Sequence, residues 1–222
     1  MSYFMRACRL ILCIAMPLAI VLLCSNVVFR ISATYVYHFN DTQVIDELGI
    51  DMYASEAADG ITQYLNSPDQ EGEFQMYIEN GSFRDPVFSK TDSEAMGRVK
   101  TVLWRELILG CVFLAVFIVD YIFLAKREYR DWLRRAGIIA SVISCALSVT
   151  MFALMRTGSF VRELYNRFVG IDLGENTLIG QMLDMDFLKV AGAFALVIAL
   201  VAIAVFLFIH IQITREEKLF FD

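Results

Sequence analysis

Four runs of apolar residues divide this sequence, and each is long enough to cross a lipid bilayer as a single helix. They cover residues 10–29, 103–125, 136–154 and 187–211. The hydrocarbon core of a bilayer is about 30 Å thick, a distance that an α-helix covers in about 20 residues. Hydrophobic residues make up 58% of the chain, and the charged residues cluster between the runs. This pattern predicts a mainly α membrane protein, a four-transmembrane-helix bundle.

The first run also has features of a signal peptide, because Arg6 and Arg9 precede it. Its apolar core is longer than the usual signal core, and no clear small-x-small cleavage site follows before Arg30. Leu23 is too large for the residue before a lipidated cysteine at Cys24. We therefore predict that this run stays in the protein as a membrane helix.

Basic residues predict the orientation of the helices. The stretch KREYRDWLRR, residues 126–135, lies between the second and third runs and carries five of them. Arg6 and Arg9 precede the first run, and Arg215 and Lys218 follow the last. By the positive-inside rule, this loop and both termini are cytoplasmic, in a multi-pass protein of the cell membrane.

The predicted organisation alternates membrane helices with external and cytoplasmic segments. In chain order these are a first helix with a short cytoplasmic N-terminus (1–31), an extracytoplasmic cap (32–102), a second helix (103–125), a basic cytoplasmic loop (126–135), a third helix (136–155), an extracytoplasmic amphipathic segment (156–186), a fourth helix (187–211) and a cytoplasmic tail (212–222).

The larger external segment is predicted to fold into a small α+β cap. Apolar residues at helical spacing predict a helix over residues 50–65, with Ser55 as its cap. Alternation predicts a strand over 73–78 that includes Phe74, and a turn leads to a second strand over 83–88. The shorter external segment has the aromatic and charged spacing of an amphipathic helix at the membrane interface.

Residues 41–94 carry thirteen acidic residues but only two basic ones, Arg84 and Lys90. Such a surface argues against binding nucleic acid or anionic lipid, and we expect no nucleic-acid partner. The five cysteines form no CxxC pair and show no metal-ligand spacing with histidine. We therefore expect no metal and no cofactor.

The residues alone offer few candidates for chemistry. His38 follows the first run, and an external histidine can act as a general base at neutral pH. The alternative is a surface histidine among aromatic residues. His210 is predicted to be a membrane-interface residue. Asp120 lies within the second run, where it is predicted to be structural and close enough to the basic loop to pair with Arg127 or to reach water.

Two further stretches match a known family pattern, in the same order and the same topological places. Residues 88–100 read FSKTDSEAMGRVK before the second run, and Phe160-Val161 and residues 172–179 (DLGENTLI) lie between the third and fourth runs. With the four helices, they resemble the lipoprotein intramolecular transacylase (Lit) family of Gram-positive bacteria. That family typically shows His-Met-x-x-Val-Lys in the first stretch, then Phe-His, then Asp-Pro-x-x-Asp-x-Leu-Ile. The resemblance covers nearly the whole chain.

The resemblance implies the transacylase fold without the transacylase chemistry. Members of the family move an acyl chain within the diacylglyceryl-cysteine of a lipoprotein, from the glycerol ester to the α-amine. Two external histidines suit the roles of base and oxyanion stabiliser. Ala95 and Val161 stand at those positions in this chain, and neither side chain can transfer a proton. We therefore expect a divergent member that is not a transacylase.

The resemblance also implies an external cleft in which Ala95 and Val161 face each other. Its other candidate residues are Met96, Val99, Lys100, Arg162, Asp172, Leu178 and Ile179. The first hypothesis is a non-enzymatic protein that binds a membrane lipid, a lipoprotein or a membrane partner through this cleft. The second is a divergent lipoprotein intramolecular acyltransferase, with His38 as base and Lys100 or Arg162 facing the oxyanion. The third is an auxiliary subunit of a membrane complex.

The predicted orientation can be tested by cysteine-accessibility labelling. A cysteine introduced near Asp69 is expected to react with an impermeant reagent from outside the cell, and one near Arg130 only from inside. Labelling of both positions from the same side would contradict the four-helix topology.

Overall fold

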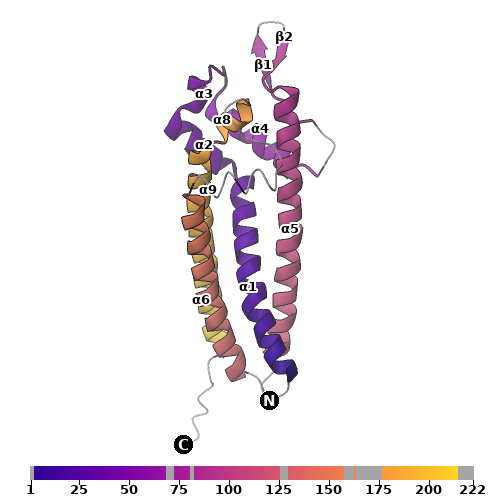
Figure 1. The fold of residues 1–222 in the computed structure, drawn as a ribbon, viewed down its shortest axis with the longest axis vertical. Helices are drawn as coiled ribbons and strands as arrows, with labels where there is room; N and C mark the ends of the chain where they lie inside the picture. Colours follow the sequence, from indigo (N-terminus) through magenta and orange to yellow (C-terminus); the bar gives the residue numbers. More distant parts are fainter. Residues whose placement is uncertain are drawn as a thin grey trace, which may run out of the picture. The chain divides into compact units, whose positions relative to one another are not determined.

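The computed structural model describes residues 3–68, 73–80, 83–125, 130–157, 163 and 177–214. Its four long helices are α1 (Tyr3–Arg30), α5 (Lys90–Leu124), α6 (Arg130–Met155) and α9 (Met185–Thr214) (Figure 1). All four are long and apolar enough to cross a membrane. A helix is the natural form for such segments, because it satisfies every backbone polar group within one chain segment. The predicted mainly α, four-helix membrane fold is confirmed.

Each long helix extends beyond the apolar run that predicted it, and α5 shows the largest difference. It begins at Lys90, rather than near residue 103 where the apolar run starts. α6 likewise begins at Arg130, within the predicted loop 126–135. Hydropathy detects only the apolar part of a helix, whereas the helix continues through polar residues as long as its hydrogen bonds and its cap are in place.

The chain divides into two compact units, and each long helix contributes a part to both. Unit 1 comprises Met1–Cys24, Leu107–Thr150 and Leu196–Asp222, and unit 2 comprises Ser25–Glu106 and Met151–Ala195. Unit 1 therefore contains only parts of the four long helices among its described residues, whereas unit 2 contains all the short helices and the strands.

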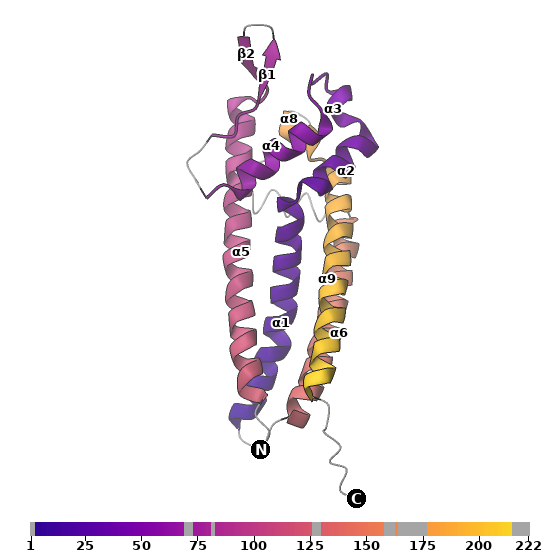
Figure 2. The ribbon, with the colours of Figure 1, turned by 180° about the vertical axis from the view of Figure 1, so that it is seen from behind.

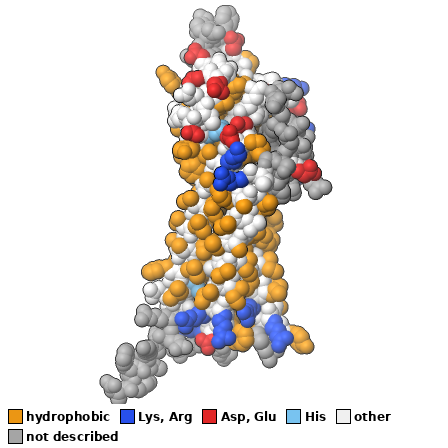
Figure 3. All heavy atoms as spheres, turned by 60° about the vertical axis from the view of Figure 1, so that its left-hand side comes forward, with side chains coloured by type: hydrophobic (Ala, Val, Ile, Leu, Met, Phe, Trp, Pro, Cys, Tyr) orange, Lys and Arg blue, Asp and Glu red, His pale blue; other side chains and the backbone are white. Residues whose placement is uncertain are grey.

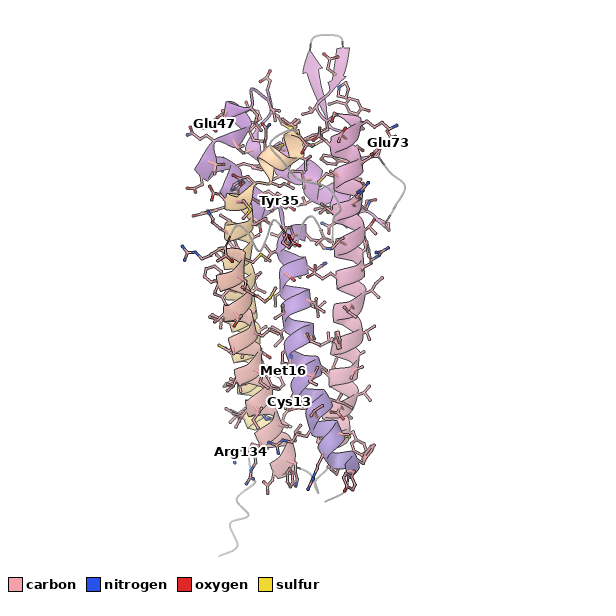
Figure 4. The ribbon with its side chains drawn as sticks, viewed as in Figure 1. Cys13, Met16, Tyr35, Glu47, Glu73 and Arg134 are labelled. Atoms are coloured by element: carbon pink, nitrogen blue, oxygen red, sulfur yellow. The ribbon has the colours of Figure 1, made fainter. Side chains whose placement is uncertain are left out.

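Unit 1 is a four-helix bundle. Its buried cluster consists of Cys8, Leu12, Met16, Leu124, Leu133, Ala136 and Ala140, from α1, α5 and α6. Figure 4 labels Cys13 and Met16 on α1 within this unit, and the Cys13 thiol lies 3.8 Å from the Ala136 carbonyl oxygen. On the face that Figure 3 shows, hydrophobic side chains cover these helices and basic side chains gather at one end. Such a surface suits contact with lipid chains.

His210 of α9 lies inside this bundle, and its predicted depth at the membrane interface stays a prediction. It is fully buried, with Nδ1 3.0 Å from the Tyr121 hydroxyl and Nε2 3.2 Å from the Arg134 carbonyl oxygen. A Cβ atom on Gly137 would lie 2.3 Å from the histidine ring. The glycine therefore makes room for a histidine whose polar atoms are both hydrogen-bonded.

Asp120 of α5 is also buried in unit 1, where the Cys8 thiol is its hydrogen-bond partner. Its Oδ2 atom has no hydrogen-bond partner among the described residues. The predicted partner Arg127 lies outside the described residues.

Unit 2 contains three short helices that follow α1: α2 (Ser32–Thr42), α3 (Val44–Glu47) and α4 (Ala54–Asn66). A hairpin of β1 (Tyr77–Asn80) and β2 (Phe83–Pro86) follows, and α8 (Leu178–Met182) precedes α9. α2 packs along α4, and α8 contacts α3 (Figures 1 and 2). The core of this unit is aromatic and aliphatic, with Tyr35, Phe39, Ile61, Leu65, Phe74, Met96, Ile179, Met182 and Phe187 each almost fully buried.

The helix and the hairpin that were predicted for the cap are both present, but their bounds differ from the prediction. The helix predicted over 50–65 is α4, but Tyr53 is its N-terminal flanking residue, so Ser55 lies inside the helix rather than at its cap. The hairpin is antiparallel, with Tyr77 paired to Pro86, and both strands are shorter than predicted. α2 and α3 were not predicted. The amphipathic helix predicted within 156–186 falls mostly outside the described residues.

Phe74 lies just before β1 and tests whether the cap has a packed core. Its ring is 1% exposed and lies 4.6 Å from the Phe88 ring and 5.1 Å from the Tyr64 ring, centroid to centroid. Phe74→Asp is expected to lower the free energy of unfolding by at least about 3 kcal/mol, because an aromatic contact is lost and a charge is buried. Thermal unfolding and limited proteolysis of the purified protein measure the effect.

The matched control is Glu73→Ala at the exposed neighbouring position (Figure 4). It is expected to unfold and to resist protease like the wild type. Wild-type protease resistance in Phe74→Asp would show that the segment is not packed as described.

Candidate functional site

Four of the sequence-predicted cleft residues form one stripe at the start of α5. Ala95, Met96, Val99 and Lys100 follow the i, i+1, i+4, i+5 spacing that places side chains on one helix face. Ala95 and Met96 are fully buried, and Val99 and Lys100 are 7% and 2% exposed. The stripe therefore belongs to the core of unit 2. The resemblance assigns a family histidine to the position of Ala95, which contributes only a methyl group to this core.

Lys100 ends the stripe with a buried ammonium group. Its Nζ atom lies 4.2 Å from the centroid of the Tyr64 ring on α4. The face of an aromatic ring attracts a cation, by about 2 kcal/mol when the pair is removed from water. Lys100 is thus held inside unit 2, whereas the resemblance placed it among the residues of an external cleft.

The beginning of α5 is positioned by a capping box that sequence analysis did not identify. Ser89 precedes the helix, and its hydroxyl accepts a hydrogen bond from the Asp92 backbone N–H at 3.2 Å. The Asp92 carboxylate in turn accepts from the Ser89 N–H at 3.0 Å and from the Ser89 hydroxyl at 2.5 Å. The S-x-x-D pattern at 89–92 marks such a box in the sequence.

Asp92 also joins α5 to the candidate residues that precede α9. Its other carboxylate oxygen accepts a hydrogen bond from the Ile179 N–H at 3.0 Å, in the first turn of α8. Thr177 caps the same turn through its hydroxyl, which accepts from the Gly180 N–H at 3.1 Å. One 3% exposed carboxylate therefore binds the ends of two helices. Ile179 is buried beside it, and Leu178 is half-buried.

A second polar network, also missed from the sequence, joins the end of α1 to α5. The Glu106 carboxylate accepts from the Ser25 hydroxyl at 2.5 Å and from the Asn26 amide at 3.3 Å. The same amide donates to the Leu103 carbonyl oxygen at 2.6 Å, and the Arg30 Nε–H donates to the Asn26 side-chain oxygen at 2.8 Å. A carboxylate inside an apolar run is a functional candidate by default. Glu106 met that criterion as well as Asp120 did.

His38 on α2 is buried at 1% exposed, so it is not a surface histidine. Its ring lies against Phe39 and Phe187, near the stacked pair of Tyr35 and Phe187. The Nε2 atom is 3.6 Å from an oxygen of Asp184, which also accepts from the Phe187 N–H and so caps α9. Neither ring nitrogen has a hydrogen bond of ordinary geometry to a described residue.

Burial lowers the pKa of His38 below its ordinary value. The carboxylate of Asp184 and the backbone of Met182 raise the pKa, and so, more weakly, do Asp186 and Asp41, but together they offset only part of the effect. The imidazole is therefore neutral at pH 7. A neutral imidazole next to a carboxylate can accept a proton, but only from a group that reaches a covered ring.

Three sequence-predicted residues, Val161, Arg162 and Asp172, lie outside the described residues. The predicted facing of Ala95 and Val161 therefore stays a prediction. Within the described ranges, no group of three His, Cys, Asp or Glu side chains is placed to hold a metal ion.

The fold of this chain matches solved structures of a known protein. No family model matches the chain, and none of the curated proteins matches it. The in meso structure of the membrane integral lipoprotein intramolecular transacylase Lit from Bacillus cereus is similar to 97% of this chain and 98% of its own, with a TM-score of 0.74 at 16% identity. This chain has the fold of Lit.

Two variants of the same enzyme agree with this comparison. The Bacillus cereus Lit structures in which one histidine is replaced by alanine or by arginine have TM-scores of 0.73 and 0.74 to this chain, each at 15% identity. Both alignments cover 96% of this chain, and 94% and 93% of those structures. The resemblance inferred from the short stretches is thus confirmed at the level of the Lit fold.

The buried histidine leads to a pH prediction. In the unfolded chain His38 titrates near pH 6.5, and in the folded chain its pKa is lower. Between the two values the unfolded chain binds more protons, so folded-state stability falls as the pH drops below about 6.5, by at most about 1.4 kcal/mol per pH unit. Thermal unfolding in detergent between about pH 7.5 and about pH 5 measures this loss.

His38→Gln is the control, since it keeps a polar side chain of similar size that does not titrate. It is expected to lose part of the acid sensitivity. Equal pH dependence in the variant and the wild type would assign the titration to another group.

Proposed function

We propose that this protein is a Lit-like integral membrane protein that has no transacylase activity and binds a membrane lipid, a lipoprotein or a membrane partner. The observation that carries the proposal is the stripe on α5. Met96, Val99 and Lys100 keep the family pattern and pack into the core, while the position of the family histidine holds the fully buried Ala95. The scaffold of the site is present and the proton-transferring side chain is not.

The chemistry explains why this substitution matters. Intramolecular acyl transfer to an amine requires a base that removes a proton and a donor that stabilises the tetrahedral oxyanion. An alanine methyl group supplies neither. By the same resemblance, Val161 replaces the second family histidine. Without both histidines, no base and no oxyanion donor lowers the activation free energy of acyl transfer. Binding an acyl chain needs only an apolar surface and neither of these groups.

A divergent acyltransferase is the second candidate, and one observation favours it. His38 lies 3.6 Å from Asp184, an arrangement in which a carboxylate orients a basic imidazole. However, the ring is covered by aromatic side chains, and Lys100, the suggested oxyanion partner, faces the Tyr64 ring. We rank this candidate second because both groups are engaged inside the core. An auxiliary role in a membrane complex is the third.

The same proposal includes the cellular setting. Four apolar helices make the chain membrane-integral. The basic residues of the N-terminus, of 126–135 and of the C-terminal tail support a cell-membrane protein with both termini in the cytoplasm. Unit 2 then faces the exterior, where lipid-modified proteins are displayed.

Mass spectrometry of a lipoprotein N-terminus tests the proposal. The wild-type chain, expressed in a bacterial strain that lacks its own transacylase, is expected to leave the diacylglyceryl-cysteine unchanged. Ala95→His combined with Val161→His is expected to yield some lyso-form lipoprotein, because both acid–base groups return, whereas either change alone is expected to yield none.

An active Lit enzyme expressed in the same strain is the positive control. Lyso-form product from the wild-type chain, lost in His38→Ala, would refute the non-enzymatic proposal and support the divergent acyltransferase.

A further inference from the structure

Two buried hydrogen-bond donors in unit 2 have no acceptor among the described residues, and they lie next to each other. They are one terminal nitrogen (NH2) of the Arg30 guanidinium and the Nε1 atom of Trp104. The central carbon of the guanidinium lies 4.7 Å from the centroid of the indole ring. A buried donor without a partner costs about 1–3 kcal/mol, and more when the group is charged. Two such donors on neighbouring side chains leave room for an acceptor that the described residues do not supply.

The other contacts of Arg30 are all to neutral acceptors. Nε donates to the Asn26 side-chain oxygen at 2.8 Å, and the other terminal nitrogen donates to the Leu65 carbonyl oxygen at 2.8 Å and to the Asn66 side-chain oxygen at 3.2 Å. No described carboxylate lies within salt-bridge distance of the guanidinium. These contacts orient the group, and the Glu106 carboxylate attracts it from beyond salt-bridge distance.

Glu106 is the nearby carboxylate, and each of its oxygens already accepts one hydrogen bond. They accept from the Ser25 hydroxyl and from the Asn26 amide, so Asn26 lies between the acid and the base. The network therefore orients Arg30 and leaves one terminal nitrogen of the guanidinium for another anion. A guanidinium fork fits carboxylate and phosphate groups, which can accept two parallel hydrogen bonds.

The position of Arg30 at the end of α1 indicates which class of ligand fits this site. Arg30 is the last residue of α1, the first membrane-spanning helix. Arginine and tryptophan at the end of a membrane helix lie at the depth of lipid headgroups. Val27 and Ile31, next to Asn26 and Arg30 in the sequence, are 41% and 40% exposed and offer an apolar surface for acyl chains. A ligand with an anionic oxygen group and acyl chains satisfies both features.

We propose that Arg30 and Trp104 bind the phosphate group of a membrane phospholipid. This inference rests on the proposed binding role of the protein and names the ligand class at one site. The phosphate oxygens accept from the free guanidinium nitrogen and from the indole N–H, and the acyl chains extend along the outer surface of α1. Arg30 and Trp104 are both partly exposed as whole residues, and binding requires their side chains to turn until the covered donors reach the ligand.

The two tryptophans of the chain make the site directly observable. Trp132 is the second one, and it lies under Arg9 in unit 1. The full-length Trp132→Phe protein therefore reports the fluorescence of Trp104 alone. Phosphatidylglycerol brominated near the top of its acyl chains, added to this protein in detergent, is expected to quench Trp104 in a saturable manner. Brominated diacylglycerol, which lacks the phosphate, is expected to quench only weakly and without saturation.

Arg30→Gln in the same single-tryptophan background is expected to weaken the apparent affinity for phosphatidylglycerol at least about tenfold, as for the loss of a charge-assisted hydrogen bond. Arg156→Gln is the matched control. Arg156 is an exposed arginine in unit 2 whose central carbon lies 5.9 Å from the centroid of the Phe152 ring, and its loss is expected to leave the quenching unchanged. Equal effects of the two substitutions would show general attraction to anionic lipid and overturn the site.

Trp104→Phe keeps an aromatic ring at this position and removes the indole N–H together with the five-membered ring, so it tests the second donor in a protein that is expected to fold. Native mass spectrometry is expected to show fewer retained phosphatidylglycerol molecules on this variant than on the wild type. Unchanged retention, or equal quenching of Trp104 by phosphatidylglycerol and diacylglycerol, would overturn the proposal. A change in Trp104 fluorescence with inorganic phosphate alone would overturn the assignment to a lipid.

These outcomes are independent of transacylation. A failure of the phospholipid site leaves the lipoprotein mass spectra as they are. A lyso-form product from the wild-type chain, in turn, would refute the non-enzymatic role whatever lipid is bound at Arg30.

Discussion

The buried carboxylate of Asp92 is the interaction on which the arrangement of unit 2 depends. It accepts hydrogen bonds from the Ser89 N–H and hydroxyl at the start of α5 and from the Ile179 N–H at the start of α8. Backbone N–H groups at helix ends lack partners within the helix, and a negative charge there is favourable. Because one side chain satisfies both helix ends, the stripe that begins at Ala95 and the turn that contains Ile179 are held in a defined relation.

The polar groups of unit 2 follow one rule, which is that each buried charge meets partners from another segment. Lys100 of α5 meets the Tyr64 ring of α4, and Glu106 meets side chains of α1. Arg30 joins the end of α1 to the end of α4. A charge removed from water without such partners would destabilise the fold by several kcal/mol. The guanidinium of Arg30 departs from this rule at one nitrogen, and that departure distinguishes it from the other buried charges.

The likeness to Lit at 16% identity shows how far a sequence can diverge within one fold. Many residue types can form an apolar membrane helix or cap a helix end, so the fold tolerates replacement at most positions. Acid–base catalysis tolerates far fewer replacements, because only a few side chains transfer protons near neutral pH. Ala95 packs within a buried stripe, and an alanine side chain cannot transfer a proton.

The sequence by itself determined the four membrane helices, the helix and hairpin of the cap, and the resemblance to Lit, because hydropathy, turn residues and short motifs are local properties. The S-x-x-D pattern at 89–92 could have predicted that α5 begins at Lys90. Only the tertiary structure showed that His38 and His210 are buried and that Arg30 stacks on Trp104. Burial and pairing depend on which distant segments meet, as when Gly137 makes room for His210 across 73 positions of sequence. No local pattern encodes such a meeting, because the hydrogen bonds and the volume that decide it come from different helices.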